Sequence, residues 1–188
     1  MSGATEAHPD PDEKPKKRSF LVWVSCLSPW RFVLFASITL VIANLLQVLV
    51  LEFLVVHFQI ALPKEDPVAK LKEKYGVAGL LFCGVVAIPW FETLLGQALP
   101  MVLTRALVKP EVPYMVLATV WFACLHGLGV DPGWEFMILS HLVGSFILAG
   151  TFLHAWYHSW WRGIWMTTIV HTAGNLTLFL YELVVEPH

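Results

Sequence analysis

Residues 31–57 read RFVLFASITLVIANLLQVLVLEFLVVH, and Glu52 is the one acidic residue in this run. A helix crosses a hydrocarbon core of about 30 Å with about 20 mostly apolar residues. The run is longer than this minimum, so it predicts a membrane-spanning helix. Lipid is therefore the expected solvent for this part of the chain.

The composition of all 188 residues extends this expectation to most of the chain. Hydrophobic residues make up 57% and charged residues 14%, whereas soluble domains average about 45–50% and about 25%. The net charge is -2, and the basic residues stand at the ends of apolar segments, which argues against a nucleic-acid-binding surface. The three cysteines form no paired framework, so we expect no disulfide.

Four further apolar stretches predict membrane-spanning helices, at residues 76–107, 113–129, 135–156 and 163–184. We therefore expect an all-α fold, a polytopic membrane helical bundle of about five transmembrane helices. Residues 76–107 are too many for one straight span and include Pro89, so this helix should be kinked near that proline.

The other segments divide the chain. Residues 1–19 are rich in Pro, Asp, Glu and Lys and predict a disordered cytosolic tail. Residues 20–60 form an interfacial segment and the first span, residues 61–75 a polar loop or surface helix, and residues 76–188 the helical core. With five crossings, eight Lys and Arg share the side of the N-terminus and four lie on the other. This bias predicts a multi-pass protein with a cytoplasmic N-terminus.

Glu92, His126, His141, His171 and Asn175 lie within the predicted spans. An ionisable group in lipid costs several kcal/mol unless it is partnered, so each is a candidate functional residue. At about 1.5 Å per residue, four of them lie about 18–22 Å deep and His171 about 12 Å. His171 and Asn175 are four apart on one helical face. We expect them to share one polar site, with His141 as the weaker candidate.

These residue types restrict the chemistry. The chain has no His-Glu-x-x-His or Gly-x-Ser-x-Gly motif and no pair of intramembrane aspartates, so serine and aspartyl intramembrane proteolysis are not expected. A carboxylate, imidazoles and a carboxamide suffice for general-base activation of water, with donors for an oxyanion or ligands for a metal. Bis-histidine haem ligation by two of His126, His141 and His171 is an open alternative.

Three motifs follow one another along the chain: ETLLGQ at 92–97, FACLH at 122–126 and HTAGN at 171–175. Together they resemble the CPBP intramembrane proteases, the group of the CAAX prenyl endopeptidases and the abortive-infection and bacteriocin-immunity proteins. The resemblance covers about half of the chain. Its first motif is divergent: members of the family carry a Glu-Glu pair followed by Arg, where this chain has Glu92, Thr93 and Gln97.

The resemblance implies an intramembrane endopeptidase in which Glu92 and His126 activate water. His171 and Asn175 would stabilise the oxyanion or bind a metal, and a divalent ion such as zinc would be held by His126 and His171. Three residues are expected in support: Thr93, Gln97 and His141.

The implied partners are the bilayer and a peptide or membrane-protein substrate, in a bacterial cell membrane. The altered first motif keeps one alternative open, a catalytically degenerate CPBP-like protein that acts as a scaffold or immunity factor.

Two other histidines receive a simpler interpretation. His154 and His158 are four apart and could bind a metal, but they stand beside Trp156 and Trp160. Aromatic residues of this kind gather at the membrane interface, and an interfacial role explains the two histidines better than ligation.

Overall fold

The computed structural model describes residues 26–58, 67–107, 111–128 and 134–185, and every regular element in these ranges is a helix. The expected all-α class is confirmed for this part of the chain. The predicted cytosolic tail at residues 1–19 and the first part of the polar segment at 61–75 lie outside the described residues.

The helices are α2 (Pro29–Phe58), α3 (Pro67–Leu81), α4 (Ile88–Glu92), α5 (Leu99–Leu107), α6 (Glu111–Gly127), α7 (Trp134–Trp156) and α8 (Trp160–Val185). Two π-helical segments, η1 (Phe82–Ala87) and η2 (Thr93–Ala98), join α3 to α4 and α4 to α5. Because α3 begins at Pro67, the described part of the 61–75 segment is a helix, the second of the two forms expected for it.

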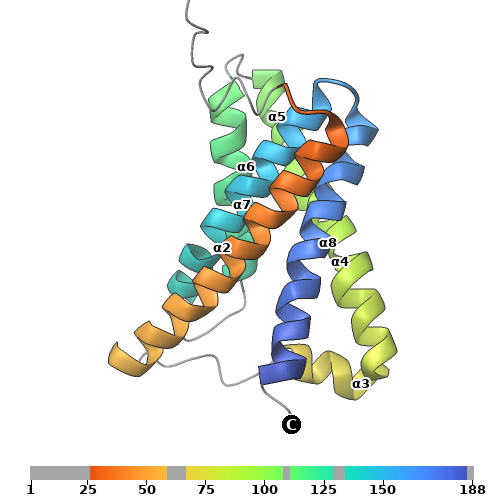
Figure 1. The fold of residues 1–188 in the computed structure, drawn as a ribbon. Helices are drawn as coiled ribbons and strands as arrows, with labels where there is room; N and C mark the ends of the chain where they lie inside the picture. Colours follow the sequence, from red (N-terminus) through yellow and green to blue (C-terminus); the bar gives the residue numbers. More distant parts are fainter. Residues whose placement is uncertain (1–25, 59–66, 108–110, 129–133, 186–188) are drawn as a thin grey trace, which may run out of the picture.

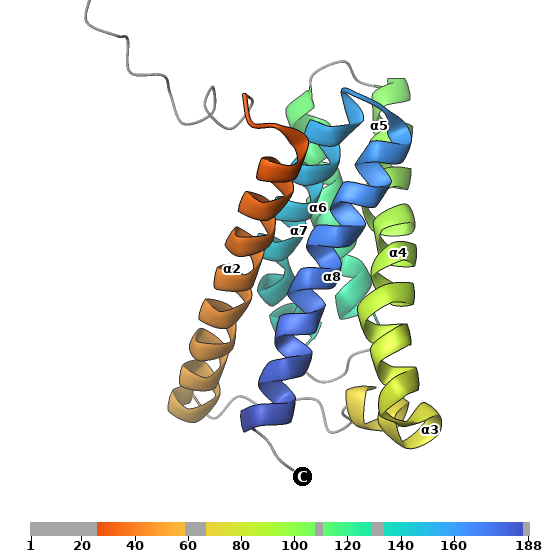
Figure 2. The ribbon, with the colours of Figure 1, turned by 45° about the vertical axis from the view of Figure 1, so that its right-hand side comes forward.

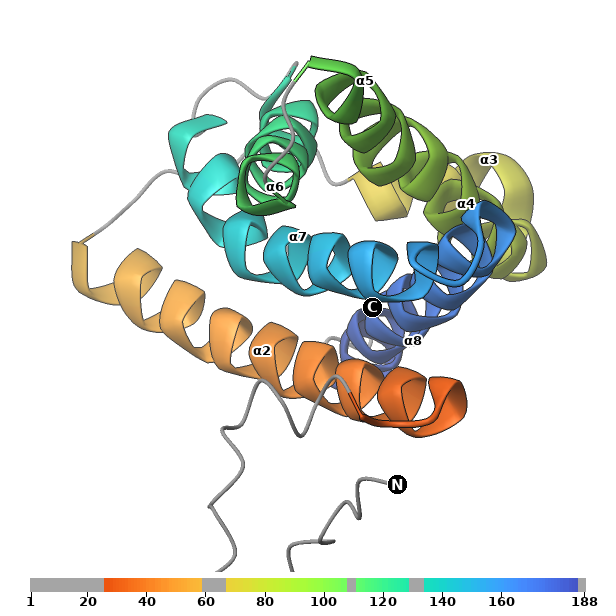
Figure 3. The same ribbon diagram turned by 90° about the horizontal axis from the view of Figure 1, so that it is seen from above.

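The long helices run between the same two ends of a bundle. Figure 1 shows α3 lying across one end, where α2 and α8 also finish. In Figure 2 the α2, α8 and α4 helices stand in front of α6 and α7. The view from above places α7 between α2 on one side and α6 on the other (Figure 3). The helix α7 therefore packs against α2, α6 and α8, whereas α4 packs against α8 and α5 against α6.

Three helices are long and apolar enough to cross a membrane: Pro29–Phe58, Lys72–Arg105 and Ile138–Trp156. Val112–Gly127 is a shorter apolar helix. The helix α8 has 26 residues but carries a series of polar side chains, among them Thr167, Thr168, His171, Thr172 and Asn175. The three apolar helices indicate a membrane protein.

The outer surface of the bundle supports this assignment. Large apolar side chains are exposed along α2, including Leu34, Ile38, Leu49 and Phe53, each more than half exposed. Soluble proteins rarely present a continuous apolar surface of this extent. In lipid the same surface carries no penalty, because hydrocarbon surrounds it.

The second long helix changes direction at Gly76, whose φ of 68° lies in the left-handed region that favours glycine. Near Pro89 the sequence predicts a kink, but the structure has a π-helical segment there instead. The chain stays helical, but its hydrogen bonding shifts to the π pattern in η1, immediately before α4. A second π segment, η2, stands in the same relation to Pro100. Each proline lacks an N–H, and each therefore leaves a carbonyl that needs another donor.

Candidate functional site

Asn175 binds a carbonyl that η1 leaves free. The N–H of Ile88 donates to Cys83 O, five residues back, instead of to Gly84 O. The π-helical donor for Gly84 O would be Pro89, which has no N–H. Asn175 Nδ2 donates to Gly84 O at 3.0 Å and satisfies it. One polar residue of the third motif thus has a structural partner across the helix interface.

Thr172, which follows His171 in the same motif, makes the neighbouring bond. Its hydroxyl donates to Val85 O at 2.8 Å, the carbonyl whose α-helical donor would again be Pro89. Two side chains of α8 therefore bind η1 directly before Glu92. In lipid an unpaired carbonyl costs several kcal/mol, so these bonds fix α8 against the segment that leads to Glu92.

The same arrangement recurs eleven positions later. The N–H of Leu99 donates to Leu94 O, so Leu95 O loses its α-helical donor. The π-helical donor for Leu95 O would be Pro100, which has no N–H. Trp121 of α6 donates its Nε1 to Leu95 O at 3.1 Å. The two π segments that flank α4, η1 and η2, are therefore bound by side chains from α8 and α6, respectively. Because α4 ends at Glu92, these bonds position Glu92.

A change of Thr172→Val tests the bond to η1. Valine keeps the shape but cannot donate to Val85 O, so we expect a loss of about 1 kcal/mol of unfolding free energy. Thr177→Val is the matched control, because the Thr177 hydroxyl donates only to Ala173 O, within its own helix. Unfolding by denaturant in detergent micelles measures both. Equal stability of the two variants would show that the bond to Val85 contributes nothing.

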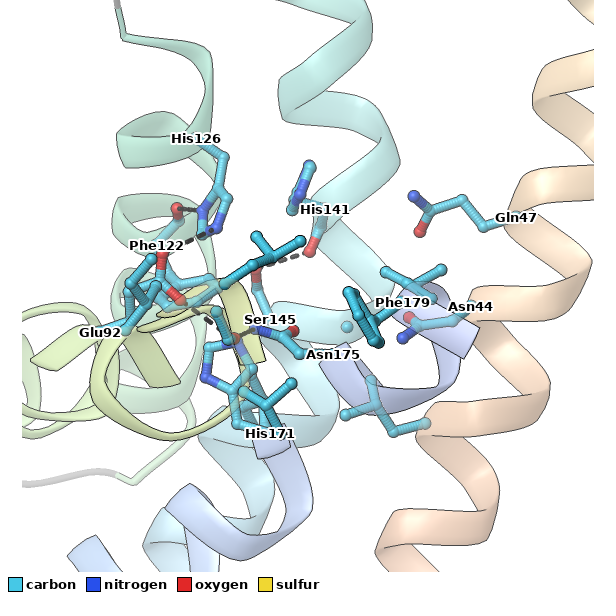
Figure 4. A pocket seen from close by; sticks show the side chains of 18 residues that line it. Asn44, Gln47, Glu92, Phe122, His126, His141, Ser145, His171, Asn175 and Phe179 are labelled. Carbon is cyan, nitrogen blue, oxygen red and sulfur yellow. Dashed lines mark hydrogen bonds and ion pairs between the residues drawn. The ribbon is translucent and has the colours of Figure 1, made fainter. Parts of the chain in front are cut away.

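Glu92 is held between two histidines. One carboxylate oxygen, Oε1, lies 3.4 Å from His126 Nε2, and the other, Oε2, lies 3.3 Å from His171 Nε2. Figure 4 shows the three side chains converging from α4, α6 and α8. The Glu92 side chain is 30% exposed and that of His171 is 7% exposed. The sequence-based expectation that these residues face one point agrees with this geometry.

The protonation of His126 is restricted by its second ring nitrogen. Nδ1 lies 2.9 Å from Phe122 O, and a carbonyl can only accept, so Nδ1 carries a proton. Its Nε2 therefore has a proton to donate only when the ring is an imidazolium. A hydrogen bond between Glu92 and His126 therefore needs a proton on the carboxyl or on Nε2. At 3.4 Å the contact is longer than a direct hydrogen bond, as is common in sites without substrate.

His171 is arranged differently. Its Nδ1 is buried and has no hydrogen-bond partner among the described residues. The neutral ring can therefore place its proton on Nε2 and donate it to Glu92 Oε2. Glu92 can thus accept a hydrogen bond from His171 on Oε2, while Oε1 faces Nε2 of His126.

Phe122 packs between the two rings. Its centroid lies 4.5 Å from that of His126 and 5.5 Å from that of His171. The segment η2 can approach this ring because its Gly96 has no side chain. A Cβ at Gly96 would lie 2.1 Å from Phe122 Cδ2. The first two motifs therefore meet in a direct packing contact, which sets the distance between η2 and α6.

These residues open on a cavity of about 340 Å³. Glu92, His126, His171 and Asn175 line it, and His141 does too. The His141 ring stacks on His126 with 4.2 Å between centroids, and His141 Nδ1 contacts the Ser140 hydroxyl. The cavity also receives Asn44 and Gln47 from α2, as Figure 4 shows. Its wall combines these polar side chains with apolar ones, such as Leu40 and Leu148.

Two supporting candidates lie elsewhere. Thr93 and Gln97 are fully buried but do not line the cavity, and the Gln97 carboxamide has no partner among the residues the structure describes. Gln97 therefore makes no hydrogen bond to a described residue that would replace those of the arginine in the family motif.

The residues present do not fit a zinc centre. In the described ranges, no group of three or more His, Cys, Asp and Glu side chains could hold a metal ion. His126 and His171, the expected ligands, both turn Nε2 toward the carboxylate of Glu92. Nor does haem fit between His126 and His141, because their stacked rings leave no room for a porphyrin.

His154 and His158 also have an ordinary explanation. The His154 ring stacks on Phe32 at 3.8 Å between centroids, almost parallel to it. The two imidazole centroids are 6.4 Å apart. Packing of α7 on α2 therefore accounts for His154.

The sequence analysis missed Asn44 and Gln47. The signal that could have found them is their position: they are carboxamides three residues apart in the apolar run at 31–57. Residues three apart share a helical face.

Comparison of the chain with family models, with curated proteins and with solved structures found no match.

Proposed function

We propose that this protein is an intramembrane endopeptidase of the CPBP type, which hydrolyses a peptide bond with water activated by Glu92. The observation that carries the proposal is the contact of each Glu92 oxygen with a different imidazole at 3.3–3.4 Å, inside a cavity walled by apolar helices. The three motifs that resemble this family supply these three residues.

Glu92 acts as the general base. It removes a proton from a water molecule in the cavity while the water oxygen attacks the carbonyl carbon of the scissile bond. His171 donates Nε2–H to Oε2 and holds the carboxylate in place. The proton taken by Glu92 passes to the leaving amine through Nε2 of His126, which lies 3.4 Å from Oε1. One water is consumed, the C–N bond breaks, and the new ends are a carboxylate and an amine.

Asn175 is the proposed donor to the developing oxyanion. One N–H of its carboxamide is used by Gly84 O, and a carboxamide has two. Asn175 also lines the cavity, so the second is available to a bound substrate. Because the first bond fixes the amide plane, the second donor is pre-oriented, which is the property that makes such donors effective.

The proposed topology has five spans, with α6 and α8 completing the three apolar helices. The start of α2, the end of α5 and the start of α8 lie at one end of the bundle (Figure 1). These segments carry Arg31, Arg105 and Arg162, and Arg105 stacks on Trp156 with 4.8 Å to the ring centroid. Basic residues beside aromatic ones favour the cytoplasmic interface. The protein is then a multi-pass protein of a bacterial cell membrane with a cytoplasmic N-terminus.

The activity can be tested by following the oxygen atom of the attacking water into the cleavage product. The protein is reconstituted with solubilised bacterial membrane proteins in liposomes, in water enriched in ¹⁸O, and new chain ends are identified by mass spectrometry. We expect new C-termini that carry one ¹⁸O from the attacking water and appear only with the intact protein. If no new termini appear, the endopeptidase proposal is wrong.

One observation favours a second candidate, a non-catalytic scaffold or immunity factor with the same fold. Among the residues that line the cavity Glu92 is the one carboxylate, whereas the family motif has two. Under this alternative, a biological effect of the protein would persist when Glu92 and His171 are both replaced. Loss of the effect together with loss of cleavage decides for the enzyme.

A further inference from the structure

Asn44 and Gln47 place two carboxamides in the cavity from the side opposite Glu92. Both residues line it, and Figure 4 shows their side chains directed from α2 toward His141 and Asn175. No hydrogen bond joins either side chain to another described residue. A carboxamide can donate two hydrogen bonds and accept two, and lipid offers none. These groups are therefore available to a ligand in the cavity.

The helices α2 and α8 are in contact on both sides of these carboxamides. On one side Leu40 packs over Gly174, where a Cβ would lie 2.8 Å from Leu40 Cδ2. On the other side Tyr181 donates its hydroxyl to Glu52 Oε1 at 2.7 Å.

The interface between α2 and α7 is open over the same stretch. The buried residues of α2 end at Leu40. Beyond it lies a second cavity, the α2–α7 groove, of about 440 Å³. It is lined by Ala43, Leu46, Gln47, Val50, Leu51, Leu54, Leu139, Ser140 and Val143. Gln47 lines both cavities and so stands where the apolar groove meets the cavity that contains Glu92.

We propose that Asn44 and Gln47 bind the main chain of an unwound transmembrane segment, which reaches Glu92 through the α2–α7 groove. This inference rests on the proposed function and names its substrate class. A helix pairs its own N–H and C=O groups, so only an unwound stretch leaves them free. A carboxamide can accept from such an N–H and donate to such a C=O. The apolar side chains of the same segment occupy the groove. A lipid acyl chain fits the groove but has no N–H and C=O pairs for Asn44 and Gln47.

The test measures binding without cleavage. The probe is a synthetic transmembrane peptide of about 20 Leu and Ala residues, with Gly-Gly at its centre and a photoactivatable leucine beside it. A second probe has Leu-Leu in place of Gly-Gly. Both are reconstituted in phosphatidylcholine nanodiscs with the Glu92→Gln protein, and crosslinks are mapped by mass spectrometry. We expect the Gly-Gly probe to crosslink to α2 and α7 residues of the groove, and more strongly than the Leu-Leu probe.

Two sets of variants test the carboxamides and the α2–α7 groove separately. Replacing Asn44 and Gln47 together by Leu removes the hydrogen bonds and should lower the Gly-Gly crosslink about tenfold. Val143→Trp fills the groove and should lower it likewise. Val116→Trp on α6 is the matched control, because Val116 is similarly exposed, at 50% against 58%, and lines neither cavity.

Crosslinks spread around the lipid-facing surface, or equal yields from the Asn44 and Gln47 double variant, would overturn this inference. So would equal binding of the two probes, which indicates a site for hydrocarbon alone. Because the protein in this test is catalytically disabled, its result is independent of whether cleavage occurs. Cleavage without groove binding would leave the endopeptidase proposal intact and remove only the proposed route.

Discussion

Glu92→Gln should lower the rate of peptide hydrolysis about a thousandfold, within the range that a positioned general base contributes. Glutamine has nearly the shape of glutamate and can still contact both histidines, but it cannot accept a proton from water. The variant should therefore keep its fold. The measurement is the initial rate of ¹⁸O incorporation into new C-termini, compared with the unaltered protein at equal amounts in liposomes.

The matched control for this change is Glu52→Gln. Glu52 is also on a long apolar helix, and a glutamine there can still accept from the Tyr181 hydroxyl. Its side chain does not line the cavity, so the hydrolysis rate should not change. A wild-type rate in Glu92→Gln would contradict the assignment of the base.

A second change tests whether Glu92 and His126 work as a unit. If one proton moves through both groups, adding His126→Ala to Glu92→Gln should lower the rate little further. Catalytic residues that act together show this non-additivity. Fully multiplied losses would mean that His126 has a separate task.

The sequence predicted the all-α class and which polar side chains meet, but not the local form of the helices that carry them. Glu92, His126 and His171 could be found because ionisable groups are rare and costly in lipid, and because depth along a helix can be counted from sequence. The four-residue spacing of His171 and Asn175 was also informative. What counting could not reveal was the partner of each polar atom. Asn175 was expected at the oxyanion, and one of its N–H groups proves to bind Gly84 O.

The π-helical segments were beyond prediction for a physical reason. Pro89 and Pro100 mark positions where a donor is missing, but a kink, a π segment or a break can each accommodate that loss. Which one occurs depends on whether a neighbouring side chain can reach the free carbonyl. Thr172, Asn175 and Trp121 decide this from other helices, and their positions follow from tertiary packing.

Gly96→Ala should be the most disruptive small substitution in the bundle. An alanine Cβ would lie 2.1 Å from Phe122 Cδ2, and the Phe122 ring is 3% exposed, so it has little room to move. Overpacking of this kind costs about 1–3 kcal/mol, which outweighs the gain of about 1 kcal/mol expected for alanine in a helix. Since Phe122 packs on both histidines, the displaced ring should also lower hydrolysis about a hundredfold.

Gly150→Ala on α7 is the matched control, because a Cβ there meets nothing nearer than Met115 Sδ at 3.9 Å. It should unfold no more easily than the unaltered protein and hydrolyse substrate at the same rate. Adding Phe122→Leu to Gly96→Ala restores space and should recover part of the lost stability. Denaturant unfolding in micelles tests the packing argument independently of catalysis. If Gly96→Ala matched Gly150→Ala in stability, the close contact between η2 and α6 would not be what positions His126 beside Glu92.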